Sequence, residues 1–292
     1  MASSFNNKLE QFIINELNGM KISILQNFDD NMNNRKNNPF CFFNDETSTA
    51  YMMVGRSFDS QLGTRLQKIA FWLAREKYGR ESVPNLMILY NHKNTLFMTL
   101  VSDNIEKSTQ QKIVWLKEES DLEKTIMHGR TKQIANGEST QYTKKYQLNT
   151  KKINYIKESI KPSKGKSNDR LVDLLYFDSN ETINCFEIKS SGNLDTKNAS
   201  ANKTEIEELE NIFSFINGKS YFATCYNNAG EGNEPIGGIF SEIPKRNQLI
   251  GSQFWKKVLP DSFSYNKFVK LYKKCFINSN IEKEISKKAK NE

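Results

Sequence analysis

The sequence predicts an α/β protein with a central mixed β-sheet flanked by helices. Short apolar runs typical of strands alternate with longer segments in which apolar residues recur every three or four positions, as they do on one face of a helix. Alternation of this kind is typical of a sheet that carries helices on its faces. The strand-like runs cover 86–90, 96–101, 219–227, 236–240 and two stretches within 171–190, and the helical patterns cover 5–27, 56–79, 204–217 and parts of 251–280.

The chain of 292 residues is long enough to bury a substantial core, and we expect a single domain, 1–292. Its core is expected at about 56–226, with a helical insert at about 103–160, where the stretch STQQKIVWLKEES is helical in pattern. The N-terminal helix 5–27 and the C-terminal helices at 251–280 are additions to that core. Polar composition predicts loops at 28–40, 160–170 and 190–203, and a frayed lysine-rich tail after Asn280.

Composition limits the function classes. The formal net charge of +8 favours an anionic partner. The four cysteines are widely spaced and form no CxxC pair, which argues against disulfides and structural zinc. No run approaches the roughly 20 apolar residues of a membrane span, and the N-terminus lacks the apolar stretch of a signal peptide, so we expect a cytoplasmic protein without a membrane partner. The glycines match no phosphate-binding motif, which argues against a nucleotide cofactor.

Three charged residues lie among apolar ones within 171–190. Asp173 belongs to the first strand-like run, and Glu187 and Lys189 lie two residues apart in the second. Because strand side chains alternate between faces, Glu187 and Lys189 point the same way. A short turn at 178–180 would fold the two runs into a hairpin and bring Asp173 beside that pair. Two carboxylates and an ammonium at one end of a small sheet would form a metal site with a built-in cation, a chemistry suited to phosphodiester cleavage.

The simpler interpretation of these residues is a surface salt bridge on an exposed face of the sheet. Both runs are apolar on either side of the charges, so the carboxylates would be partly buried, which is costly without a compensating ion. Helical patterns also lie before and after the two runs, at 56–79 and 204–217, as helices that flank a sheet would. These two observations favour a functional site.

The pattern Asp173–x13–Glu187–x–Lys189 on neighbouring strands, followed by a helix, resembles the PD-(D/E)XK nuclease superfamily. Within it, the arrangement resembles the type II restriction endonucleases. Val172 stands where the family's name has proline, a weak feature of the pattern. The resemblance implies a restriction-endonuclease-like core in a single nuclease domain.

A second stretch, SFDSQLGTRLQKIAF at 57–71, resembles the helix that precedes the core in many restriction enzymes. That helix aims a polar residue, often glutamate, at the metal site, and here the residue would be Gln67. The resemblance thus covers about 56–226. Glutamine in place of glutamate would leave two acids at the site, and the number of metal ions stays open at one or two.

The resemblance implies Mg²⁺-dependent hydrolysis of both strands of double-stranded DNA at a short specific site. Mg²⁺ takes oxygen ligands and keeps several waters, and Asp173, Glu187 and the backbone carbonyl of Ile188 would supply ligands. Lys189 would stabilise nascent hydroxide and the scissile phosphate. A palindromic site is matched by a protein with a two-fold axis, so the implied enzyme is a homodimer.

Basic residues in the loops around the predicted sheet are the candidate DNA contacts. Phosphate contacts supply affinity, and contacts to base edges supply the choice of sequence. The Asn-containing loop 227–235 could read bases, although its composition is also that of an ordinary solvated loop, and the same alternative holds for each basic residue. The candidates are Lys164, Lys166, Lys197, Lys203, Lys245 and Arg246.

Two other functions are compatible with the same residues. A structure-selective repair or junction-resolving nuclease would use the same core on a different DNA substrate. A non-catalytic DNA-binding module on a degenerate nuclease fold would bind DNA without metal-dependent turnover. The complete Asp–Glu–Lys set argues against the non-catalytic module.

Overall fold

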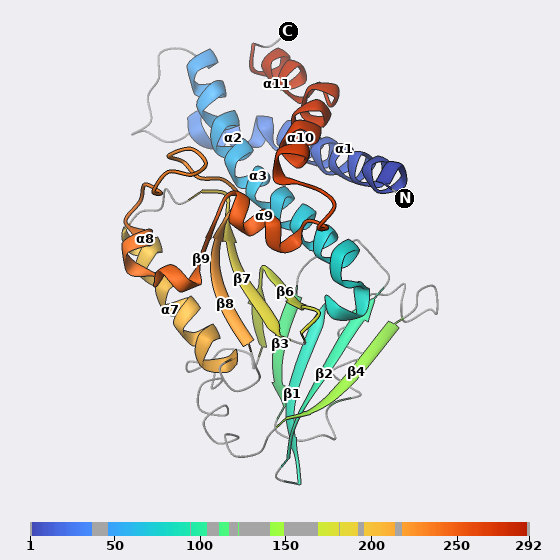
Figure 1. Cartoon of the computed structure of the whole chain (residues 1–292). Coiled ribbons are helices and arrows are strands. Elements are labelled where there is room, and N and C mark those ends of the chain that lie inside the picture. Colours follow the sequence, from blue (N-terminus) through green and yellow to red (C-terminus); the bar gives the residue numbers. More distant parts are fainter. Residues whose placement is uncertain are drawn as a thin grey trace. The chain divides into compact units, whose positions relative to one another are not determined.

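The computed structural model describes residues 2–36, 46–93, 95–103, 111–116, 122, 141–148, 169–180, 182–191, 196–213 and 218–290. The chain forms two compact units, which we call the helical unit (Met1–Ile69 with Asp261–Glu292) and the sheet unit (Ala70–Pro260). Figure 1 labels their helices and strands. The candidate catalytic residues Asp173, Glu187 and Lys189 all belong to the sheet unit.

The helical unit is built around the long N-terminal helix α1. This helix packs against two C-terminal helices and presents apolar residues to the core at three- and four-residue steps. The predicted helix at 5–27 is therefore present. The helices of this unit are α1 (Ala2–Gln26), α2 (Phe28–Lys36), the first part of α3 (Glu46–Tyr78), α10 (Tyr265–Asn278) and α11 (Ile281–Ala289). The buried residues of α1 are Leu9, Ile13, Leu17, Met20 and Ile24.

The Asn-rich segment 28–40, predicted as a loop, contains α2 in its described part. Asp29 and Asp30 lie in the first turn, where carboxylates favour the positive end of the helix dipole. Phe28 is buried in a small cluster with alanines of α3 and α11. The prediction of a loop was wrong because this apolar anchor and the acidic first turn outweigh the polar composition.

The lysine-rich tail after Asn280, predicted to be frayed, forms α11. Ile281, Ile285 and Ala289 are buried at four-residue steps, so this highly charged helix still has an apolar face. Acidic residues occupy its first turn and basic residues its last, as the helix dipole favours. These features stabilise a helix where the composition alone indicated disorder.

The described strands of the sheet unit form two mixed sheets. The five-stranded sheet has the order β4-β2-β1-β3-β5, and the four-stranded sheet has the order β6-β7-β8-β9. The predicted fold class, mixed sheet with flanking helices, is confirmed, but the strands divide into two sheets. The strands are β1 (Leu86–His92), β2 (Thr95–Asp103), β3 (Gln111–Leu116), β4 (Gln141–Leu148), β5 (Asp169–Val172), β6 (Leu174–Phe177), β7 (Ile183–Lys189), β8 (Gly218–Thr224) and β9 (Gln248–Ile250).

One apolar core joins both sheets to the helix α7 (Thr196–Phe213). α7 packs along β8 and β7, and Figure 1 shows it beside β8. The core residues are Met87, Leu89, Met98, Leu100, Ile113, Trp115, Val172, Leu175, Phe177, Ile183, Cys185, Leu209, Ile212 and Phe213. The two sheets are therefore parts of one packed structure.

Gln111, which is almost fully buried, also connects the two sheets. It opens β3 of the five-stranded sheet, and its side-chain amide bonds the main chain of Leu175 in β6 of the other. Its Nε2 donates to the carbonyl oxygen of Leu175 and its Oε1 accepts from the amide of Leu175, each at 2.7 Å. Gln111 thus fixes the main chain two residues after Asp173.

The predicted helical insert at about 103–160 contains two strands, β3 and β4, in its described part. In β3, Gln111, Ile113 and Trp115 are buried, whereas Lys112 and Val114, which alternate with them, are half-buried. This two-residue period is that of a strand. The prediction of a helix was wrong because the charged residues flanking this short run imitate a helical spacing.

Two further boundaries differ from the prediction. α7 begins at Thr196, so it includes the second half of the predicted loop 190–203. Its Ala199 is buried in one apolar cluster with Ile239. The predicted strand at 236–240 leads instead into the short helix α8 (Ile239–Glu242). The edge strand next to β8 is β9, which precedes α9 (Ser252–Val258).

Candidate active site

β6 and β7 form the predicted hairpin. They pair antiparallel, with Leu174 opposite Phe186 and Phe177 opposite Ile183. Asp178 organises the turn between them, since its Oδ1 accepts hydrogen bonds from the backbone amides two and four residues ahead, at 2.9 and 3.1 Å. A side chain that ties the turn to its own backbone holds the register of both strands.

Asp173 is the single residue between β5, which pairs with β3, and β6, which pairs with β7. The chain therefore passes from one sheet to the other at this residue. β6 begins at Leu174, which lies opposite Phe186 of β7. Just before this strand, the carboxylate of Asp173 bonds the main chain of β7: its Oδ2 accepts from the Ile188 amide at 2.7 Å.

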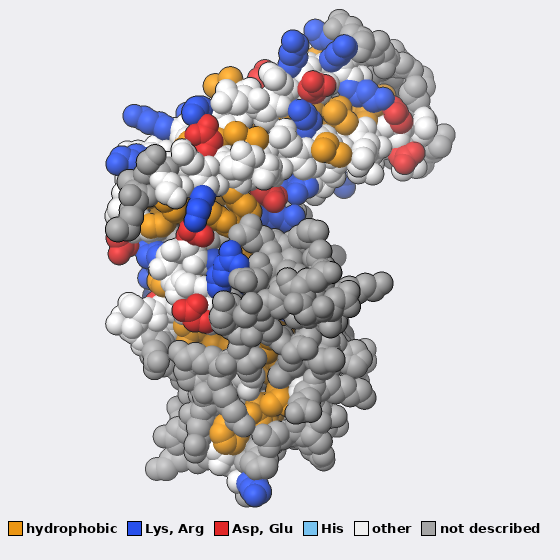
Figure 2. Space-filling view, turned by 90° about the vertical axis from the view of Figure 1, so that its right-hand side faces the viewer, with side chains coloured by type: hydrophobic (Ala, Val, Ile, Leu, Met, Phe, Trp, Pro, Cys, Tyr) orange, Lys and Arg blue, Asp and Glu red, His pale blue; other side chains and the backbone are white. Residues whose placement is uncertain are grey.

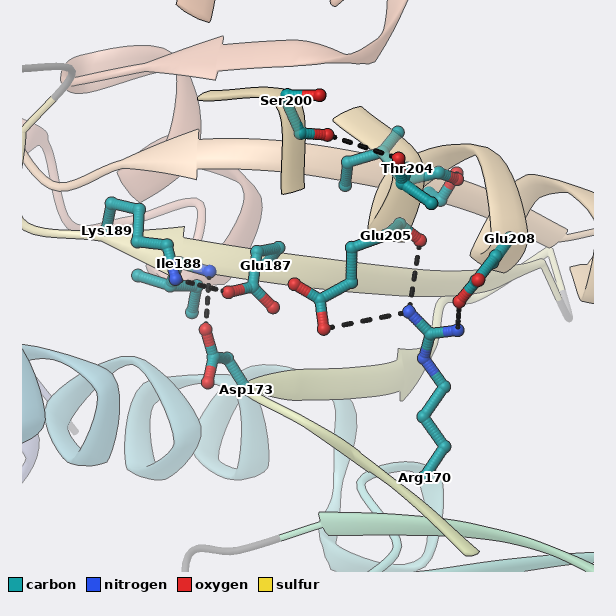
Figure 3. A network of polar contacts seen from close by, with 11 residues as sticks. Arg170, Asp173, Glu187, Ile188, Lys189, Ser200, Thr204, Glu205 and Glu208 are labelled. Carbon is teal, nitrogen blue, oxygen red and sulfur yellow. Dashed lines mark hydrogen bonds and ion pairs between the residues drawn. The ribbon is translucent and has the colours of Figure 1, made fainter. Parts of the chain in front are cut away.

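Glu187 and Lys189 point to the same side of β7, as the alternation predicts, and form an ion pair. The Glu187 side chain is 12% exposed and that of Lys189 is 32% exposed. Ile188, which lies between them, and Phe186, which precedes them, are buried on the opposite side of the strand. Figure 3 shows the Asp173 carboxylate approaching the same stretch of β7 from the neighbouring segment. The structure thus brings the three predicted residues together.

Burial and charge shift the protonation of this group. Burial, followed by the negative charge of Glu187, raises the pKa of Asp173 to about 7, against the opposing effects of the Ile188 amide and Lys189. Burial alone would lower the pKa of Lys189, but the charge and hydrogen bond of Glu187 outweigh it and raise that pKa. Two carboxylates and one ammonium leave a surplus of negative charge that a cation would neutralise.

Figure 3 shows a second network beside this group, which the sequence did not indicate. Arg170, three residues before Asp173, reaches from β5 to α7. Its Nη1 donates to Glu208 at 2.5 Å, and its Nη2 donates to the carbonyl oxygen of Glu205 at 3.2 Å and lies 3.7 Å from the Glu205 carboxylate. Glu205 and Glu208 lie three residues apart on α7 and so share one helix face. That spacing was the only signal in the sequence.

Glu205 responds electrostatically to the catalytic candidates. Burial, followed by the charge of Glu187, raises the pKa of Glu205, while Arg170 opposes the shift. The charge of Glu205 in turn contributes to the raised pKa values of Asp173 and Lys189. Glu208 is not among the main contributors to either shift.

The other predicted site residues are Gln67 and the candidate DNA contacts. Gln67 lies on α3 in the helical unit, and its role stays a prediction. Lys164 and Lys166 lie outside the described residues, as does the side chain of Lys197. The other predicted DNA contacts have acidic partners: Lys203 pairs with Glu242 at 3.5 Å, Lys245 with Glu234 at 3.2 Å and Arg246 with Glu210 at 3.8 Å.

The Asn-containing loop at 227–235 is organised by its own side chains. Asn228 bonds both the amide and the carbonyl of Ile236, at 3.2 and 2.6 Å. Asn227 and Asn233 likewise bond loop backbone. These amides support the loop itself, so base reading by them stays a prediction.

The donor set fits a hard divalent cation. Asp173 and Glu187 present carboxylate oxygens, and the carbonyl of Ile188 directly follows Glu187 in sequence. Among the described residues, no group of three or more His, Cys, Asp or Glu side chains is arranged to hold a metal. The candidate ligands are therefore two carboxylates and a main-chain oxygen, with room in the coordination sphere for water and phosphate.

A family model described as type II restriction endonuclease, HinfI, matches residues 1–276. The chain belongs to the HinfI family. No curated protein and no solved structure matches the chain. The HinfI-family match covers both units and includes all three candidate catalytic residues.

Membership of the HinfI family confirms the resemblance drawn from the Asp–Glu–Lys pattern. The protein is a type II restriction endonuclease, a site-specific hydrolase that acts on DNA. Enzymes of this type generally use divalent metal ions. Within the described part of the chain, no helix combines the length and hydropathy that a membrane span requires.

Proposed function

We propose that Asp173, Glu187 and Lys189 form the catalytic centre of a Mg²⁺-dependent enzyme that cuts both strands of double-stranded DNA at a short specific site. The observation that carries this proposal is the bond between the Asp173 carboxylate and the Ile188 amide. That bond holds a carboxylate from one strand junction beside a half-buried Glu–Lys pair on the next strand.

Asp173 and Glu187 would hold the ion, with the Ile188 carbonyl as a further oxygen ligand. Burial, followed by repulsion from Glu187, raises the pKa of Asp173, and this supports the assignment, since a bound cation would favour the charged carboxylate. We choose Mg²⁺ because the donors are all oxygens and few in number, which suits an ion that keeps several of its waters. A bound divalent ion lowers the pKa of its water and stabilises charge on the phosphate.

Lys189 supplies the positive charge that the chain itself contributes to the reaction. Its ammonium lies on the same side of the strand as Glu187. The pKa of Lys189 is raised there, so the ammonium remains charged at neutral pH. A charged lysine donates hydrogen bonds to the scissile phosphate and to nascent hydroxide, stabilising the negative charge that develops there. Glu187 orients the ammonium and balances its charge until DNA binds.

A plasmid-digestion experiment tests the catalytic centre. The wild-type chain with Mg²⁺ is expected to give discrete DNA fragments, EDTA to prevent cleavage, and Asp173→Asn to abolish it. The asparagine oxygen can still accept from the Ile188 amide, so loss of cleavage without a loss of thermal stability reports chemistry rather than folding. Full cleavage by Asp173→Asn would refute the assignment, and a smear would indicate a structure-selective nuclease.

The proposal includes a homodimer and contacts from Lys203, Lys245 and Arg246 to DNA. Symmetric cleavage of a palindromic site follows most simply from two copies related by a two-fold axis. Because each of these basic residues has an acidic partner, binding would exchange protein carboxylates for phosphates. Light scattering of the free protein tests the dimer, and a mass of one chain both free and on DNA would exclude it.

A further inference from the structure

Helix α10 of the helical unit carries an uncompensated positive face. Its 14 residues include four lysines and no acidic residue. Figure 2 shows basic and acidic side chains interspersed over the described part of the face that it displays, so the net charge of +8 does not by itself locate a DNA contact. α10 concentrates one sign of charge on a single element. The lysines are Lys267, Lys270, Lys273 and Lys274.

The lysines lie on one side of this helix and the apolar residues on the other. Phe268 and Cys275 are buried where α10 packs against α1, and all four lysines are exposed. At about 100° per residue, the four lysines span about 120° of the helix circumference, away from that buried side. The result is a positive stripe roughly two turns long.

The positive charge is not balanced within the described residues. Lys274 pairs with Glu10 of α1 at 2.6 Å, whereas Lys267, Lys270 and Lys273 form no ion pair with any described residue. The other acidic residue of α1, Glu16, pairs with Arg65 at 3.0 Å.

The stability of the helix does not account for these lysines. α10 has no acidic residue in its first turn and no basic residue in its last, so its charges are not placed to favour the helix dipole. Lys267 lies in the first turn, where positive charge is unfavourable. α11, by contrast, has acids first and bases last. The stripe on α10 is therefore available to bind an external anion.

We propose that the α10 stripe (Lys267, Lys270 and Lys273) binds the phosphate backbone of the DNA substrate, without reading its sequence. The proposal rests on the DNA-cleaving function and adds a contact surface in the helical unit. Lysine is a flexible point charge that suits phosphate oxygens, and such contacts give salt-dependent affinity common to all sequences. The charge complementarity of an all-lysine face and a polyanion favours DNA over a protein partner.

The experiment measures binding of the full-length chain to a non-specific DNA duplex by fluorescence anisotropy over a range of salt concentrations. EDTA is present, so that a metal-dependent nuclease does not turn over. The variant Lys267→Gln/Lys270→Gln/Lys273→Gln is compared with Lys283→Gln/Lys287→Gln/Lys290→Gln. The second variant removes the same charge from exposed positions in and just after α11.

The α10 variant is expected to reduce the slope of log K against log salt by about 2 to 3. The α11 variant should change the slope by less than half as much. Lys267→Arg/Lys270→Arg/Lys273→Arg should retain the wild-type slope, because it keeps the charges. Equal slopes for the α10 variant and wild type overturn the proposal. So does a change of oligomeric mass with unaltered DNA affinity, which would make the stripe a protein interface.

Two results distinguish failure of the proposed function from failure of the α10 stripe. Wild-type protein that binds duplex DNA through α10 but leaves plasmid intact with Mg²⁺ would refute the catalytic centre and support the stripe. Wild-type protein that cleaves, together with an α10 variant of unchanged slope, would refute only the stripe.

Discussion

Two Glu–Lys pairs in this protein show what burial adds to an ion pair. Glu187 and Lys189 lie on β7, with side chains 12% and 32% exposed. Glu234 and Lys245 lie in the segment between β8 and β9, with side chains 82% and 83% exposed at a separation of 3.2 Å. Both pairs are close in space, and the first also shifts the pKa values of two neighbouring carboxylates, Asp173 and Glu205.

The difference comes from the solvent. Water around the exposed pair screens its charges, and pairs of this kind contribute between about 0 and 1 kcal/mol. Around the β7 pair, apolar strands replace water, so each charge interacts more strongly with its neighbours. An E-x-K pattern is therefore informative only where the strand around it is buried.

The largest expected effect is the loss of DNA cleavage when either residue of the β7 pair is replaced. Glu187→Gln removes a metal-ligand candidate, and Lys189→Gln removes the cation beside the phosphate. Each should lower kcat by at least about 100-fold, because each removes a charge aimed at the reacting group. Single-turnover cleavage of a duplex with Mg²⁺ measures the rates. A rate near that of wild type in either variant would contradict the roles assigned here.

A smaller effect is expected at the Arg170 network, where Glu205 and Glu208 share one arginine. Glu205→Gln should change the Mg²⁺ concentration for half-maximal cleavage by roughly tenfold, since its charge is felt by Asp173 and Lys189. Glu208→Gln is the matched control and should change it much less. A metal titration of cleavage rate measures both, and equal shifts would show that only the tie between β5 and α7 matters.

The pH dependence of stability is expected to be moderate. Because the pKa of Asp173 is raised to about 7 in the folded protein from an ordinary 3.8, the folded state binds more protons between those values. This group therefore makes the free energy of unfolding fall as pH rises from about 4 to about 7 when EDTA removes divalent ions. Urea denaturation at several pH values measures it. Asp173→Asn should flatten this part of the profile, and an unchanged slope would contradict the shift.

The smallest effect is expected at the exposed pair. Glu234→Gln and Lys245→Gln should each change the free energy of unfolding by no more than about 0.5 kcal/mol, since solvent screens both charges. Chemical denaturation of the two variants and of the double variant measures the coupling between them. A coupling above about 1 kcal/mol would show that exposure is a poor guide to the strength of this pair.

The sequence predicted that Asp173, Glu187 and Lys189 lie together, because the information for this arrangement is local. Strand alternation placed Glu187 and Lys189 on one side, and the turn at 178–180 brought Asp173 near them. The Arg170–Glu205–Glu208 network was missed because it joins a strand to a helix about 35 residues later, as the separation of Arg170 and Glu205 shows. No local pattern contains that pairing.

The errors in secondary structure have a related cause. α2 and α11 are polar in composition, and their few apolar residues become decisive only when other helices cover them. β3 is short and flanked by charged residues, so its two-residue period was obscured. Division of the strands into two sheets depends on which strand pairs with which, a tertiary choice that periodicity does not encode.

The position of Asp173 constrains how this enzyme can be re-engineered. At this residue the main chain passes from the five-stranded sheet to the four-stranded sheet, and the side chain of Gln111 hydrogen-bonds one sheet to the other. Neither sheet can therefore be exchanged alone, because a chimera joined between the two sheets would displace the Asp173 carboxylate. Exchanges between relatives should therefore carry 111–116 and 169–189 together, or leave both untouched.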